Sequence, residues 1–289
     1  MKNLDIQPAN TLELQRLEEE DTPINGRFAE RRKPKPSRAW ASLRGAYLPI
    51  AVVVVWQFVC SMQWVPATIL PSPLQICESI KQLAQSGELF GDIGISLLRA
   101  ALGFALGAGI GLITGLLVGL YRPFEQILDP SVQMLRTIPH LAITPLFILW
   151  FGLGELSKDL LIATGAFFPM YINTFMGVRS VDAKLFDVAR VLEFSRRKQL
   201  FKLILPAALP NVLLGLRLAI GIAWLGLVVA EMMGSSSGVG YLILNAEQFS
   251  QTAIVFVGLI IFAVIGKASD SLVRFLERRL LRWRDSYRG

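Results

Sequence analysis

The stretch IGISLLRAALGFALGAGIGLITGLLVGL, residues 93–120, contains a single charged residue, Arg99, and is otherwise dominated by apolar and small residues. A helix that crosses the hydrocarbon of a bilayer needs roughly 20 such residues, so this stretch is long enough to span a membrane. Glycine recurs at every fourth position, at Gly103, Gly107, Gly111, Gly115 and Gly119. Residues four apart advance by about 40° around a helix, so these glycines form one slowly winding groove. The groove predicts close approach of a second helix.

The whole chain has the composition of a membrane protein. Of its 289 residues 53% are hydrophobic and only 18% are charged, and the mean hydropathy is +0.50. Backbone polar groups in hydrocarbon must be satisfied within their own segment, so each long apolar run predicts a helix. The predicted spans are residues 47–62, 93–120, 132–151, 156–176, 212–232 and 253–273. The fold class is therefore all-α, a polytopic membrane bundle of six transmembrane helices.

The placement of the basic residues predicts the orientation. The net charge is +7, but Lys and Arg gather in residues 27–44, 179–202 and 267–288, away from the other connecting segments. By the positive-inside rule these three stretches are cytoplasmic, which places both termini in the cytoplasm. This placement argues against nucleic-acid binding as the reason for the positive charge. We expect a cytoplasmic, largely disordered tail over residues 1–45 that ends in a short interfacial helix at residues 38–45. A transmembrane domain follows over residues 46–276, with a cytoplasmic loop at about residues 179–210, and residues 277–289 form a basic cytoplasmic tail.

Two other features of the chain leave alternatives open. The basic residues before the first apolar run also fit a cleaved signal, although no convincing small-residue cleavage site follows and a retained span is favoured. Residues 68–92 predict a turn and then an amphipathic helix at the outer surface, with Leu74, Ile76, Ile80 and Leu83 as its apolar residues. That helix is either a packed connector or a docking surface.

The third predicted span is broken by RTIPHLAITP, residues 136–145. Pro139 and Pro145 each remove a backbone donor, so we expect a kink. Arg136 and His140 are four residues apart, which predicts that they share one face of the helix that precedes the kink or continues through it, with Thr137 beside them. Ionisable residues at this depth indicate a water-lined path, while the alternative for Arg136 is that it extends to the interface.

Other polar residues within the spans complete the candidate translocation path. Arg217 either extends toward the cytoplasm or lines the path, Glu231 lies near the outer end of the fifth span, and Trp224 is either a packing residue or a path residue. We expect Arg99 to extend outward to the membrane surface. The spans show no paired Asp or Glu. This argues against a secondary transporter, which would move its solute without an ATPase partner. One histidine and two cysteines exclude a multi-histidine or thiolate metal centre.

A charged stretch, FDVARVLEFSRRKQLFKLILP, residues 186–206, interrupts the apolar runs. Ser180 or Asp182 is the predicted N-cap of a first helix with Leu185, Val188, Ala189 and Leu192 on one face. Ser195 is predicted to cap a second short helix that Pro206 stops or redirects. The stretch therefore predicts two short amphipathic helices joined by a tight elbow, which suits docking to another protein.

This stretch resembles the conserved cytoplasmic loop of ABC importer permeases, the Glu-Ala-Ala motif. Asp187 stands for the glutamate, Val188 and Ala189 for the alanines, and residues 204–206 for the closing Ile-x-Leu-Pro. The family glycine falls at Glu193. Glycine adopts a left-handed backbone freely and Glu does so only at a cost, so the elbow is either strained or shaped differently.

The resemblance extends over residues 49–283, where the chain is similar to permeases of the nitrate, taurine and sulfonate importers, the aliphatic sulfonate ones above all. It implies a type I permease fold in the bacterial inner membrane, a second copy of the chain, two cytoplasmic ATPase subunits that bind ATP and Mg²⁺, and an extracytoplasmic binding protein. No Gly-x-x-x-x-Gly-Lys-Ser/Thr nucleotide motif occurs in the sequence, so the chain itself is expected to bind no cofactor.

The resemblance and the pattern together give two groups of candidate residues. The predicted contacts with the ATPase are Asp182, Leu185, Phe186, Asp187, Ala189, Arg190, Leu192, Glu193, Ser195 and Pro206. The predicted translocation path comprises Arg136, Thr137, His140, Arg217, Trp224 and Glu231. A sulfonate, nitrate, bicarbonate, taurine or a heterocycle is the expected cargo, with the first favoured.

Overall fold

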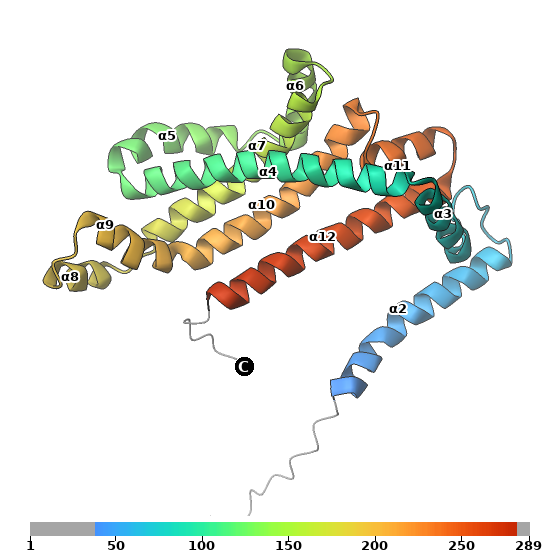
Figure 1. The fold of residues 1–289 in the computed structure, drawn as a ribbon, viewed down its shortest axis with the longest axis horizontal. Helices are drawn as coiled ribbons and strands as arrows, with labels where there is room; N and C mark the ends of the chain where they lie inside the picture. Colours follow the sequence, from blue (N-terminus) through green and yellow to red (C-terminus); the bar gives the residue numbers. More distant parts are fainter. Residues whose placement is uncertain (1–37, 282–289) are drawn as a thin grey trace, which may run out of the picture. The chain divides into compact units, whose positions relative to one another are not determined.

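The computed structural model describes residues 38–281 as a chain of helices (Figure 1). The helices are α2 (Arg38–Ser61), α3 (Pro73–Ser86), α4 (Glu88–Leu120), α5 (Arg122–Leu135), the 3-10 turn η1 (His140–Ile143), α6 (Thr144–Phe151), α7 (Glu155–Arg179), α8 (Ala183–Val191), α9 (Arg196–Gln199), the π turn η2 (Leu200–Ile204), α10 (Leu205–Gly234), α11 (Val239–Gln248) and α12 (Thr252–Leu280). No strand occurs in the described residues, and the all-α class is confirmed. The chain divides into two compact units after Val52, and every contact below lies within residues 53–281. Of the tails predicted over residues 1–45 and 277–289, residues 1–37 and 282–289 lie outside the described part.

The glycine groove of α4 receives α7, as its spacing predicts. A Cβ atom on Gly107 would lie 2.0 Å from the carbonyl oxygen of Ala163, and one on Gly111 would lie 2.6 Å from that of Phe167. The other three glycines of the stripe face α7 in the same way. Because only hydrogen fits at these positions, the two backbones come into direct van der Waals contact along the seam.

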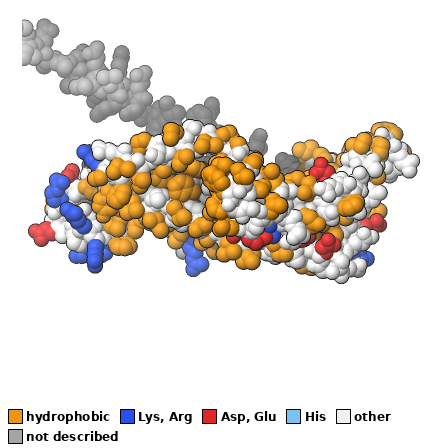
Figure 2. All heavy atoms as spheres, turned by 90° about the horizontal axis from the view of Figure 1, so that it is seen from above, with side chains coloured by type: hydrophobic (Ala, Val, Ile, Leu, Met, Phe, Trp, Pro, Cys, Tyr) orange, Lys and Arg blue, Asp and Glu red, His pale blue; other side chains and the backbone are white. Residues whose placement is uncertain are grey.

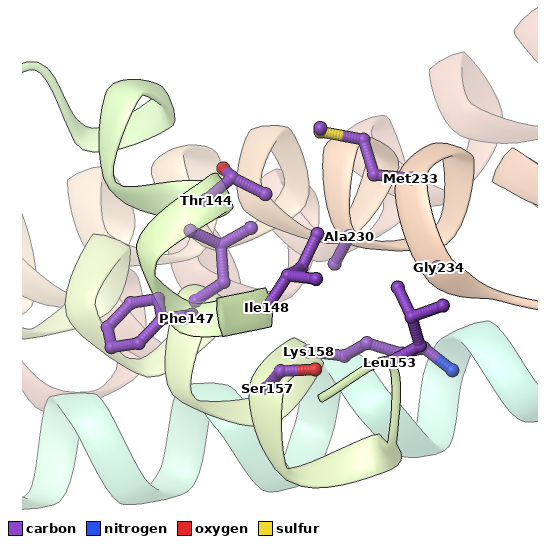
Figure 3. A pocket seen from close by; sticks show the side chains of 10 residues that line it. Thr144, Phe147, Ile148, Leu153, Ser157, Lys158, Ala230, Met233 and Gly234 are labelled. Carbon is purple, nitrogen blue, oxygen red and sulfur yellow. The ribbon is translucent and has the colours of Figure 1, made fainter. Parts of the chain in front are cut away.

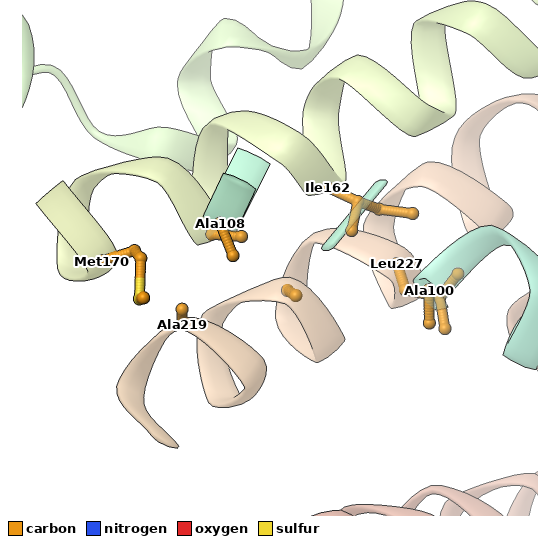
Figure 4. Close-up of a cluster of buried hydrophobic side chains, with 8 residues drawn as sticks. Ala100, Ala108, Ile162, Met170, Ala219 and Leu227 are labelled. Carbon is orange, nitrogen blue, oxygen red and sulfur yellow. The ribbon is translucent and has the colours of Figure 1, made fainter. Parts of the chain in front are cut away.

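A core of small and apolar side chains joins α4, α7 and α10. In Figure 4, Met170 of α7 lies near Ala219 of α10 toward one end of this core, and Ile162 of α7 lies near Leu227 of α10 and Ala100 of α4 toward the other. Alanine on α4 and α10 keeps the three helices close, while the larger residues of α7 fill the space between them. This three-helix core is the scaffold on which the candidate sites are placed.

Helices α3, α11 and α12 form a second packed group. Ser72 begins α3 with a capping box: its hydroxyl accepts the N–H of Gln75 at 3.2 Å, and the Gln75 side chain accepts the N–H of Ser72 at 2.9 Å. Ile76 and Leu83 are buried against residues of α11 and α12. The amphipathic helix predicted here is confirmed, and its buried face makes it a packed connector. Its position relative to the membrane stays a prediction.

The third predicted span is two helices at a steep angle. Helix α5 ends at Leu135, and the axis turns by 86° before η1 and α6 continue. The kink expected from Pro139 and Pro145 is therefore present. The prediction that Arg136 and His140 share a helix face is wrong, because Arg136 caps the end of α5 and His140 opens the turn beyond the bend.

Within residues 38–281, four helical segments are long and apolar enough to cross a membrane, namely α4, α7, residues 196–234 and α12, or five if the bent pair counts as one span. The apolar part of α2, Tyr47–Ser61, is shorter. Multi-pass insertion is thus supported, while the sixth crossing rests on the sequence prediction. Figure 2 shows hydrophobic side chains over much of one face of the molecule, as expected for surfaces that meet lipid or another chain.

Candidate functional site

Helix α8 forms within the charged stretch as its sequence predicts. The Asp182 side chain accepts the N–H of Lys184 at 3.0 Å and is the N-cap, which decides between the two candidates Ser180 and Asp182. Ser180 instead follows the last residue of α7. A short helix is therefore fixed directly at the end of a membrane-spanning one.

The apolar residues of α8 divide between two sides. Ala189 is buried, and Phe186 packs against the cluster around Val178 and Ile204. Leu185, Val188, Val191 and Leu192 stay exposed, Val191 at 82%. Ala189 therefore does not lie on the exposed apolar side with Leu185 and Leu192 as predicted, because that side of α8 faces outward while Ala189 faces the bundle. Asp187 and Arg190 lie on the exposed surface and form a long ion pair of 3.4 Å.

The elbow after α8 adopts the left-handed backbone despite the side chain of Glu193. Glu193 has φ of +49°, and the N–H of Phe194 donates to the carbonyl of Ala189 at 2.9 Å, which closes the helix end. Of the two alternatives that the sequence left open, the strained one holds. A non-glycine residue in this region costs roughly 1–2 kcal/mol.

Beyond the elbow the chain enters α10 without a stop. Ser195 caps α9 by accepting the N–H of Lys198 at 3.4 Å, as predicted. The helix then widens into η2, where Leu205 donates to the carbonyl of Leu200, and continues through Pro206 into α10. The prediction that Pro206 stops or redirects the chain is wrong. The wider turn precedes Pro206, and a proline in the first turn of a helix needs no N–H partner.

The residues predicted for the translocation path are not brought together in this chain. Arg136 and Thr137 are exposed at the end of α5. The His140 ring lies between α7 and α10, where a Cβ on Gly165 or Gly226 would lie 2.9 or 3.0 Å from Nε2, so these glycines make room for it. The assignment of Arg136, Thr137 and His140 to a translocation path stays a prediction.

The three predicted path residues of α10 contact different partners. Arg217 donates from Nε to Asp270 of α12 at 2.7 Å. Trp224 packs against Phe262 of α12 with ring centroids 6.5 Å apart, and it lines a cavity of about 260 Å³ between α4, α10 and α12. Glu231 is fully buried. These contacts give Arg217 and Trp224 a packing role between α10 and α12 beside any role in transport, and Glu231 belongs to the network described next.

A polar network that sequence reasoning missed surrounds Arg99. Nη1 of Arg99 donates to Glu231 at 3.0 Å and to the carbonyl of Ser237 at 2.7 Å, while Nε and Nη2 donate to Glu155 at 2.6 and 2.9 Å. Nη2 also reaches the Ser237 hydroxyl at 3.3 Å, so the five N–H donors of the guanidinium all have acceptors. Arg99 does not extend to the surface as expected. It is 5% exposed because two carboxylates and a loop enclose it.

The same network holds the loop between α10 and α11. Glu231 accepts the Ser96 hydroxyl at 2.7 Å and the N–H of Gly240 at 2.9 Å, and Asp92 accepts the N–H of Gly238 at 2.7 Å. A Cβ on Gly238 would lie 2.3 Å from Glu231 Oε1. Glu155 of α7 and Glu231 of α10 thus both bind Arg99 of α4, an arrangement that the sequence did not reveal.

Comparison with known proteins agrees with these features. A family model described as "Binding-protein-dependent transport system inner membrane component" matches residues 107–282. The chain is 62% identical over 267 residues to an aliphatic sulfonates transport permease protein, SsuC, of Bacillus subtilis, covering 92% of this chain and 96% of the relative. It is 47% identical to SsuC of Escherichia coli, with 87% and 96% covered, and 34% identical to the taurine transport system permease protein TauC of the same species, with 80% and 86% covered.

The relatives are named as transport permeases, and such a family member works with an ATP-hydrolysing subunit and a substrate-binding protein. The multi-pass helices, the short helix beyond the end of α7 and the match over most of the chain agree with one another. The chain belongs to the family of binding-protein-dependent transport system inner membrane components, the membrane-spanning permease subunits of ABC importers, and has their all-helical type I fold.

Proposed function

We propose that two copies of this chain form the translocation path of an ABC importer for a small anion, an aliphatic sulfonate. The 62% and 47% identity to proteins named as aliphatic sulfonates permeases, each over most of both chains, supports this cargo. Taurine carries a sulfonate group too, and the taurine permease is more distant at 34%. Nitrate, bicarbonate and a heterocycle are the alternatives within the same class.

The observation that carries the coupling mechanism is the surface of α8. Leu185, Val188 and Leu192 stay 42–58% exposed on a short helix whose other side is packed against the bundle. Apolar side chains on a helix that is too polar to insert into lipid fit a groove in another protein. We assign that groove to the ATPase subunit.

Each of two ATPase subunits would bind ATP and Mg²⁺ and receive one α8 helix. Because α8 is joined to α7 and the elbow runs into α10, a push on α8 reaches both spanning helices at once. Closure of the ATPase dimer would then tilt these helices between two packings, as rigid bodies.

The proposed orientation puts α8 and both termini in the cytoplasm. Arg190, Arg196, Arg197 and Lys198 gather around the elbow, as the positive-inside rule requires of a cytoplasmic segment. The start of α7 and the end of α10 then lie at the outer side, where a binding protein would deliver the cargo.

The test is transport by the reconstituted assembly. We expect proteoliposomes that contain the chain, its ATPase and its binding protein to accumulate labelled methanesulfonate only when ATP is present on the side of the ATPase. Unlabelled ethanesulfonate should compete more strongly than nitrate or bicarbonate. Accumulation against a gradient by the chain alone, or efficient competition by nitrate but not by sulfonates, would contradict the proposal.

A further inference from the structure

Glu155 occupies a site that is built from two buried cations. Its carboxylate accepts from Arg99 Nε at 2.6 Å, from Arg99 Nη2 at 2.9 Å and from Lys158 Nζ at 2.8 Å. The side chains of Arg99 and Lys158 are 7% and 6% exposed, whereas that of Glu155 is 59% exposed. Two buried cations, Arg99 and Lys158, thus bind a carboxylate that is exposed to solvent.

The two edges of the Arg99 guanidinium differ in how firmly their partners are held. Glu231 on one edge is fully buried and is fixed further by Ser96 and the N–H of Gly240. Among the residues that the structure describes, the Glu155 carboxylate on the other edge accepts hydrogen bonds from Arg99 and Lys158 alone. A carboxylate that is 59% exposed regains water when it leaves a cation, so breaking the Glu155 contact costs less on the carboxylate side than breaking the Glu231 contact. Arg99 and Lys158 stay buried and lose a partner, so the release of Glu155 needs a second anion in its place.

The donors that Glu155 occupies match a sulfonate. A guanidinium edge binds two oxygens of a planar or tetrahedral oxyanion side by side, and an ammonium adds a point charge for a third. Arg99 Nε, Arg99 Nη2 and Lys158 Nζ supply three donors, and a sulfonate has three oxygens. A carboxylate has two, and Oε1 of Glu155 already accepts from both cations.

We propose that the outward edge of Arg99 together with Lys158 is an oxyanion-binding site, which Glu155 fills in this structure and which a sulfonate takes when Glu155 turns into solvent. The assignment of a sulfonate, and of this end of α7 to the outer side, rests on the proposed function. Since Glu155 is the first residue of α7 and follows the link Gly152–Gly154 to α6, its release frees the junction of these helices.

The surroundings decide how an anion enters. Figure 3 shows the small cavity beside Lys158, which α6, α7 and α10 line and which holds about 10 Å³, room for one water. A sulfonate is larger, so it must arrive from the exposed side of Glu155. Three carboxylates oppose it. Glu231 and Asp92 are both engaged in the network, and Asp159, one turn after Glu155, has a buried oxygen with no hydrogen-bond partner in the described part of the chain.

The experiment measures anion binding without transport. The full-length chain is placed in phosphatidylcholine nanodiscs, so that no anionic headgroup competes, and thermal unfolding is followed against methanesulfonate concentration. Dimethyl sulfone, of similar size and without charge, is the matched control ligand. We expect methanesulfonate to raise the midpoint of Glu155→Gln saturably, at a concentration about tenfold or more below that needed for the unsubstituted chain, because the internal competitor has been removed.

Two further variants keep the test decisive. Lys158→Met in the Glu155→Gln background should abolish the response, and Asp159→Asn in the unsubstituted chain should strengthen it, so the proposal stands or falls even if Glu155→Gln does not fold. Equal responses to methanesulfonate and dimethyl sulfone, or a response independent of Lys158, would overturn the site. Sulfonate uptake by the full assembly without such binding would overturn the site alone, and binding without sulfonate uptake would overturn only the assigned cargo.

Discussion

Helices α7 and α10 connect two ends that are built in opposite ways. At one end, α8 and the elbow expose apolar side chains and carry a long ion pair on the surface, and the backbone of Glu193 is left-handed. At the other end, Arg99 is buried with all of its donors satisfied, and the loop after α10 is tied to Glu231 and Asp92. The first end exposes apolar side chains that fit a partner protein, while at the second end the buried donors of Arg99 have their acceptors within the chain. A movement imposed on α8 therefore acts against a firmly held far end.

The largest expected effect comes from breaking the buried end. Glu231→Leu leaves Arg99 without its most deeply buried partner, and we expect the free energy of unfolding to fall by about 3–5 kcal/mol, measured by denaturation in nanodiscs. Asp270→Leu is the matched control, because Asp270 also pairs with arginine, but Arg217 and Arg274 are 43% and 37% exposed. That change should cost less than about 1 kcal/mol. Equal losses would mean that the two ends of α10 do not differ in the way described.

The exposed end should respond in binding and not in stability. Val191→Asp places a charge on the most exposed apolar residue of α8, and we expect binding to the ATPase to weaken by about 2 kcal/mol or more, with the unfolding midpoint unchanged. Affinity of the nanodisc-embedded chain for purified ATPase is the measurement. Lys184→Ala is the control on the same helix, since Lys184 is exposed and is not among the predicted contacts with the ATPase. A fall in unfolding midpoint with intact binding would show that Val191 acts within the fold.

The seam between the two ends offers a paired test two residues apart. Gly107→Ala forces a methyl group onto the carbonyl of Ala163 and should cost about 1–3 kcal/mol of stability. Gly109 has no atom within 4 Å of a new Cβ, so Gly109→Ala should be neutral or stabilise the helix by about 0.5–1 kcal/mol. Comparable losses at both positions would show that glycine matters to α4 itself and not to its contact with α7.

Local sequence patterns predicted the parts of the structure that depend on neighbours in the chain. The four-residue glycine spacing predicted the close approach of a second helix, which the structure identifies as α7. Ser195 was predicted as one N-cap and either Ser180 or Asp182 as the other, because a cap bonds to backbone within three residues of itself. The kink at Pro139 and Pro145 follows from missing donors in the same segment.

The Arg99 network was beyond the reach of those patterns. Its partners Glu155 and Glu231 are 56 and 132 residues away, and one sequence holds no signal for which of several span residues meet. Arg99 and Glu231 were visible as ionisable residues within spans, which marks them as noteworthy but names no partner. The course of the chain at Pro206 depended on a π turn that no residue type specifies.

The smallest expected effect concerns the strain at the exposed end. Glu193→Gly removes the cost of a left-handed side chain and should stabilise the elbow by about 1 kcal/mol, whereas Glu193→Ala keeps the same backbone strain and should not. Hydrogen exchange at Phe194, whose N–H closes α8, measures this locally. If glycine slows exchange there while alanine does not, the elbow stores strain that a bound ATPase must overcome or use. If the Phe194 amide exchanges at the same rate in both variants, contacts around the left-handed turn stabilise it. The exposed end is then less strained than the φ angle of Glu193 indicates.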